Sequence, residues 1–133
     1  MSREQAVAQA QAYFDSGAMK TDLARLVAIP TESQNPDRSA ELDRYITTEM
    51  EPLLTSMGFR CQLLTHPKAK GPFLFAERFE GTHLPTIFGY GHGDVIRGLH
   101  KDWQEGLSPW ELKEVGDRWY GRGVVDNKGQ RLI

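Results

Sequence analysis

The hydrophobic pattern of the sequence changes its period at Gly58. Between Ser39 and Met57, apolar side chains recur at the spacing of an amphipathic helix. Pro52 falls inside this stretch, so we expect a kink or a break near Glu49. Directly after Gly58 the apolar residues follow a strand-type pattern instead. A chain that changes from helical to strand periodicity in this way is expected to fold as an α/β layer structure.

Helices are predicted before this stretch and strands after it. Residues 3–15 are rich in the helix formers Ala, Gln and Glu, and residues 21–30 form a short amphipathic pattern that Thr21 or Asp22 can cap and Pro30 ends. The remaining predicted elements are strands over 59–66, over 71–81 and centred on Thr86 to Tyr90, a long loop over 98–110, and a hairpin over 110–123 with Gly116-Asp117 at its turn.

Composition excludes several functional classes. The chain has 133 residues, which fits one domain, and a net charge of −2, which gives no basic surface for nucleic acid or an anionic membrane. No apolar run approaches the length of a transmembrane helix, and the polar start has no signal-peptide core. Cys61 is the single cysteine, so no internal disulfide is expected. A cytoplasmic location is the default expectation.

The stretch GYGHGDVIRG, residues 89–98, is the first candidate for chemistry. His92 and Asp94 are two positions apart in a glycine-rich turn that follows an apolar run. Functional groups of open α/β sheets tend to lie just beyond the carboxyl ends of strands. Histidine binds divalent metals through one ring nitrogen, and the other nitrogen usually needs an acceptor. Asp94 can be that acceptor, or it can support a neighbouring group.

The stretch WYGRGVVDNKG, residues 119–129, is the second candidate. Asp126 follows two valines, and its two equivalent carboxylate oxygens can bridge a pair of metal ions.

Other functional interpretations fit these stretches less well. GYGHGD lacks the spacing of a dinucleotide-binding loop, and DNKG lacks the alternating acidic ligands of an EF-hand. Packing of the long loop is expected for the tryptophans, and a salt bridge or loop hydrogen bond for Arg122.

Taken together, these stretches resemble the M20 family of zinc metallopeptidases. The resemblance is carried by GHGDV, the loop with Trp103, GLSPWEL and GDRWYGRGVVDNKGQ, and also by LARLVAIPTES and LLTSMGF, so that it covers residues 20 to 130. The family contains dinuclear-zinc aminopeptidases, dipeptidases and deacylases, including acetylornithine deacetylase-like and succinyl-diaminopimelate desuccinylase-like enzymes. Its catalytic domain is a mixed α/β sheet with flanking helices.

The resemblance implies a role for three residues. His92 would be a ligand to one zinc, and Asp126 would bridge both zincs. Asp94 would orient His92 and is the expected catalytic residue. The resemblance also implies a cis peptide bond after Asp126. The implied cofactor is zinc, two ions in the full-length family, with cobalt or manganese as substitutes.

The resemblance further implies that residues 1–133 are an incomplete, truncated M20-type catalytic domain without the dimerisation domain. In the family, a glutamate general base and further metal ligands follow this region. Two zincs sharing one carboxylate need five ligand residues, of which His92 and Asp126 are two. We therefore expect a metal-dependent hydrolase of peptide or N-acyl amide bonds that binds zinc weakly and is inactive alone.

The alternative is a non-enzymatic remnant with an incomplete metal site and an exposed sheet edge. The expected partners are a small peptide or N-acyl amino acid as substrate. A homodimer is expected only with the dimerisation domain, and neither nucleic acid nor a membrane is expected as a partner.

Overall fold

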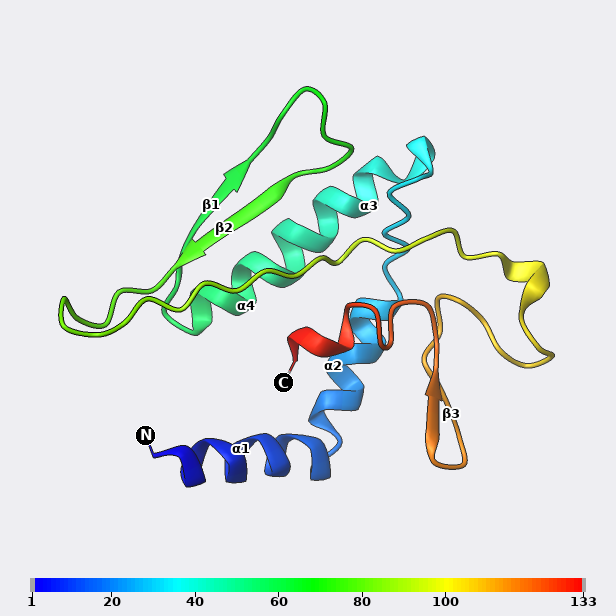
Figure 1. Ribbon diagram of the computed structural model, residues 1–133. Helices are drawn as coiled ribbons and strands as arrows, with labels where there is room; N and C mark the ends of the chain where they lie inside the picture. The colour runs from blue at the N-terminus through cyan, green and yellow to red at the C-terminus, as the bar shows by residue number, and fades with distance from the viewer. Residues whose placement is uncertain (1, 133) are drawn as a thin grey trace. The chain divides into compact units, whose positions relative to one another are not determined.

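The computed structural model describes residues 2–132, which fold as two compact units (Figure 1). Unit 1 combines Met1–Ile29 with Gly98–Ile133, and unit 2 is Pro30–Arg97. Helices and small sheets are both present, which agrees with the expected α/β class. Among the residues described, no helix is long and apolar enough to cross a membrane.

Unit 1 begins with two helices, α1 (Arg3–Asp15) and α2 (Ala18–Val27). The prediction of a helix over 3–15 is confirmed, and Ser2 starts it with a capping box in which its hydroxyl accepts the Gln5 N–H. The predicted cap of the second helix was wrong, because α2 begins at Ala18 instead of after Thr21 or Asp22. Gly17 has a left-handed φ of 78°, which ends α1 and lets α2 start at the next residue.

The buried core of unit 1 lies on α2. Its apolar members are Met19, Leu23, Leu26, Val27 and the following Ile29. Strands β3 (Lys113–Val115) and β4 (Arg118–Tyr120) form an antiparallel hairpin in the same unit. Gly116 has a positive φ of 64° in the turn between them, so the predicted hairpin and its turn are both confirmed.

One long helical stretch runs through the first half of unit 2. It consists of α3 (Ser39–Arg44), a π-helical segment (Tyr45–Met50) and α4 (Glu51–Ser56). In the π-helical segment the Glu51 N–H donates to the Ile46 carbonyl, one residue further back than in an α-helix. Pro52 follows directly, and its ring is incompatible with the carbonyl position of a regular helix. The irregularity predicted near Glu49 is therefore present, as a wider turn.

Strands β1 (Arg60–Leu64) and β2 (Phe73–Glu77) follow in unit 2 as an antiparallel pair. Their register places Arg60 opposite Glu77 and Leu64 opposite Phe73, and β1 also packs with α4. The strands predicted over 59–66 and 71–81 are confirmed with shorter bounds. The pairs β1–β2 and β3–β4 form two separate sheets of two strands each.

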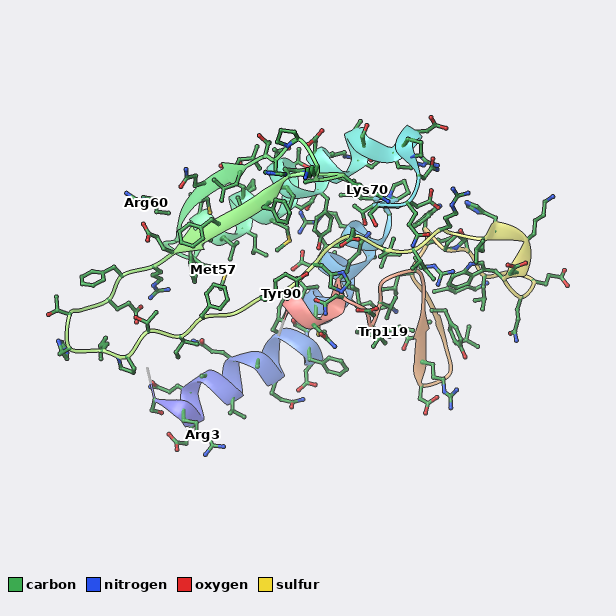
Figure 2. All side chains as sticks on the ribbon, turned by 45° about the horizontal axis from the view of Figure 1, so that its top comes forward. Arg3, Met57, Arg60, Lys70, Tyr90 and Trp119 are labelled. Carbon is green, nitrogen blue, oxygen red and sulfur yellow. The ribbon has the colours of Figure 1, made fainter. Side chains whose placement is uncertain are left out.

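The strand predicted around Thr86 to Tyr90 was wrong, because these residues have no regular secondary structure. A strand needs backbone hydrogen bonds to a neighbouring strand, and among residues 2–132 none pairs with this segment. Its large apolar side chains are consequently exposed, with Ile87 at 92% and Tyr90 at 86% of full exposure. Tyr90 is labelled in Figure 2, where it projects from the extended chain.

Candidate metal centre

In the segment 91–94, which has no regular secondary structure, the His92 ring lies next to Asp94, as their spacing predicts. Nδ1 of His92 lies 3.0 Å from the Asp94 carbonyl oxygen and 3.3 Å from its carboxylate Oδ1. Both oxygens are acceptors, which favours a hydrogen on Nδ1. A metal ion would then bind His92 through Nε2, the nitrogen on the opposite side of the ring.

Thr31 fixes the backbone of this segment through two hydrogen bonds. Its fully buried hydroxyl donates to the Gly93 carbonyl at 2.6 Å, and its own carbonyl accepts the Val95 N–H at 2.8 Å. The next residue, Glu32, forms an isolated parallel bridge with Val95. The segment after α2 therefore fixes the backbone on both sides of Asp94.

The carboxylate of Glu32 is also buried, and it organises the loop that carries Thr31. It accepts a hydrogen bond from Asn35 Nδ2 at 2.9 Å and lies 3.8 Å from Arg38 Nε. The local sequence around Thr31 gives no signal of this role. The partner of Thr31 lies 62 positions further along the chain, and no local pattern links the two.

We expect Thr31→Val to lower the free energy of unfolding by about 1–3 kcal/mol, because it leaves the Gly93 carbonyl without its buried donor. Urea denaturation measures this change. The matched control is Thr47→Val in the same unit, which removes an exposed hydroxyl bond to the Asp43 carbonyl of 2.9 Å. Equal losses in both variants would contradict a special role for Thr31.

Asp126 lies in unit 1, on a turn that follows the β3–β4 hairpin. Its side chain is exposed, and the Asp126–Asn127 peptide bond is cis, which confirms the expectation for this bond. The turn is closed by the Lys128 N–H, which donates to the Gly123 carbonyl at 2.9 Å. Asn127 adds a bond of 2.6 Å from its amide to Gln130. The backbone around Asp126 is therefore held by several local contacts.

Lys128 is the most unusual residue of this turn, and sequence reasoning missed it. Its side chain is fully buried, and Nζ donates to the carbonyls of Leu26 at 2.8 Å and Ile29 at 2.6 Å. This burial lowers the pKa of the Lys128 ammonium group to about 7. A lysine between asparagine and glycine has the composition of an exposed loop, so its residue type gave no signal of burial.

Arg122 has the structural role that we expected. Its Nη2 donates to the Gly98 carbonyl at 3.2 Å, and its guanidinium lies 5.3 Å from the centre of the Trp103 ring. Trp103 donates to the same carbonyl at 2.7 Å. Trp119, labelled in Figure 2, stacks on Phe14 with ring centres 5.8 Å apart. These contacts pack the long loop and the hairpin of unit 1.

Known proteins similar to this chain are hydrolases. No family model matches the chain. The chain is 43% identical over 61 residues to Beta-Ala-His dipeptidase of Mus musculus, which is 46% of this chain and 12% of that protein. It is 42% identical over 50 residues to succinyl-diaminopimelate desuccinylase of Rickettsia massiliae, which is 37% of this chain and 13% of that protein.

Two solved structures have the same fold. Human carnosine dipeptidase 1 matches 97% of this chain with a TM-score of 0.84 and 27% identity. The chain is related to the M20 dipeptidases. The dipeptidase Dug1p from Saccharomyces cerevisiae matches 94% with a TM-score of 0.76, and at 18% identity it supports the fold alone. In each case the match spans 28% of the solved chain.

The three site residues that the M20 resemblance implies are divided between the units. His92 and Asp94 belong to unit 2 and contact each other, whereas Asp126 belongs to unit 1. Within residues 2–132, no group of three or more His, Cys, Asp or Glu residues could hold a metal ion. An oriented imidazole and an exposed carboxylate are nevertheless zinc-type donors, so they fit two of the ligands of an M20 centre. Their roles as ligands stay a prediction.

Proposed function

We propose that this chain carries part of the metal centre of an M20-type hydrolase that cleaves peptide or N-acyl amide bonds. The observation that carries the proposal is the likeness to carnosine dipeptidase, which extends over 97% of the chain. The His92–Asp94 contact supports the same assignment, because the resemblance implies that Asp94 orients His92.

His92 and Asp126 are the proposed metal ligands, and Asp94 is the proposed positioning residue. Asp94 accepts the Nδ1 hydrogen of His92, which fixes the tautomer and presents Nε2 to the metal. Asp126 is exposed on a constrained turn, where its carboxylate would be a metal ligand. Bound zinc would supply a water of lowered pKa and would polarise the scissile carbonyl. Cobalt and manganese are suitable replacements.

We also propose that the isolated chain is catalytically inactive. A dinuclear zinc centre needs five ligand residues, and the proposed set here contains two. The proposed general base, a glutamate in the family, is not matched to any residue of this chain. We propose that residues 1–133 correspond to the N-terminal part of an M20 catalytic domain. The proposed substrates are dipeptides and N-acyl amino acids, and the proposed location is cytoplasmic.

The test combines a zinc titration with an assay of hydrolysis on the purified chain. Complete structural zinc sites provide about 10–16 kcal/mol of binding free energy, and we expect this partial set to give less than about 8 kcal/mol, or a Kd above about 1 µM. We expect no zinc-dependent hydrolysis of β-Ala-His. Rapid zinc-dependent turnover would contradict the proposed inactivity. A chain that binds no zinc at all would contradict the metal role and favour the non-enzymatic alternative.

A further inference from the structure

We propose that Lys128 is a positioning residue that holds the Asp126 turn against the C-terminal end of α2. This inference rests on the proposed function, because a fixed Asp126 turn matters for metal binding only if Asp126 is a metal ligand. Lys128 itself makes no proposed contact with metal or substrate.

The contacts of Lys128 connect two distant parts of unit 1. Its Nζ donates to the carbonyls of Leu26 and Ile29, about one hundred positions earlier in the chain. These carbonyls lie at and just after the end of α2, and the Leu26 carbonyl also accepts the Ile29 N–H at 3.3 Å. The lysine is therefore both an anchor for the turn and a cap for α2.

The backbone between this anchor and Asp126 has little freedom. The Lys128 N–H donates to the Gly123 carbonyl, and a Cβ added at Gly129 would lie 2.1 Å from the Val124 carbonyl oxygen. Asp126 lies between these fixed points, two residues before the anchor. A change at the Lys128 anchor is thus transmitted to the Asp126 carboxylate through only two peptide units.

Burying a lysine is costly, so its presence calls for a reason other than packing. An apolar side chain of similar length would fill the same space without the cost of desolvating an amine. It would not supply donors to Leu26 and Ile29, whose carbonyls would lose a buried partner. The lysine thus specifies one arrangement of the turn, and an apolar residue would permit several.

The test compares Lys128→Met with the matched control Lys113→Met. Lys113 belongs to the same unit, and its Nζ also donates to a backbone carbonyl, that of Gly106 at 2.7 Å, but on the surface. The first measurement is amide hydrogen exchange without metal, read at Val124 and at residue 128, whose N–H groups close the turn. We expect exchange at least tenfold faster in Lys128→Met and unchanged in Lys113→Met.

The second measurement is the zinc Kd, with the visible spectrum of bound cobalt as a probe of ligand geometry. We expect at least tenfold weaker zinc binding and an altered cobalt spectrum in Lys128→Met alone, because residues that orient ligands typically contribute this much. Unchanged exchange and unchanged zinc affinity would overturn the inference. If the unaltered chain binds no zinc, the proposed function fails, and the exchange measurement still decides whether Lys128 positions the turn.

If Lys128→Met does not fold, Lys128→Gln is measured in its place, because glutamine keeps an N–H donor on a shorter side chain. We expect its exchange rates to lie between those of the unaltered chain and of a chain without the anchor. If Lys128→Met is unfolded and Lys128→Gln exchanges like the unaltered chain while binding zinc equally well, Lys128 serves stability alone and the inference is wrong.

Discussion

Replacing Gly93 with alanine is expected to lower the free energy of unfolding by about 1–3 kcal/mol, the usual cost of forcing extra volume into a packed site. A Cβ at this position would lie 2.0 Å from Cε1 and 2.6 Å from Cζ of Tyr45. The Tyr45 ring is buried at 2% exposure, so it has no open space into which it can move. The segment 91–94 would have to shift instead, and with it the Thr31 hydroxyl bond to the Gly93 carbonyl.

Gly89→Ala is the matched control for this prediction. Gly89 lies in the same glycine-rich stretch, and a Cβ there would meet no atom within 4 Å. Urea denaturation of both variants should give a large change for Gly93→Ala and a change within about 0.5 kcal/mol for Gly89→Ala, as is usual for surface positions. Similar stability of the two variants would mean that Tyr45 does not pack against the His92–Asp94 segment.

Replacing His92 with alanine is expected to weaken zinc binding by at least tenfold. The residue supplies one of the two proposed ligands, and even residues that only orient a ligand contribute about 10–100-fold to affinity. Asp94→Ala should weaken zinc binding less than His92→Ala, because it removes the carboxylate at 3.3 Å but keeps the backbone carbonyl that lies 3.0 Å from Nδ1. Calorimetric titration of the metal-free chain measures both changes.

His66→Ala is the control for the loss of a histidine. His66 is exposed in the loop between β1 and β2, where its Nδ1 accepts the Lys68 N–H at 3.2 Å. Zinc affinity should not change in this variant. An equal loss in His66→Ala and His92→Ala would indicate unspecific binding of zinc to surface histidines, and it would remove the support for a metal role of His92.

Local patterns were sufficient to predict the elements whose hydrogen bonds are local. The helix over 3–15 and the hairpin with Gly116-Asp117 at its turn follow from neighbouring residues, and both are present. The segment 86–90 has an equally suitable composition but forms no strand, because pairing depends on a partner strand that its own sequence cannot specify. The early start of α2 depended on the left-handed conformation of Gly17.

The candidate site also combines features that follow from local sequence with features that depend on distant residues. The contact between His92 and Asp94 follows from a spacing of two residues, and the role of Asp126 came from the family resemblance. The supports of both segments could not be predicted, because Thr31 and Lys128 contact residues far away in sequence. Each is a polar residue that looks exposed by type and becomes fully buried only through these distant contacts.

The proposed metal role of His92 and Asp126 is tested most directly by zinc titration of the unaltered chain, His92→Ala and Asp126→Asn. We expect each variant to bind zinc at least tenfold more weakly than the unaltered chain. Variants that bind zinc like the unaltered chain would contradict the proposed ligands.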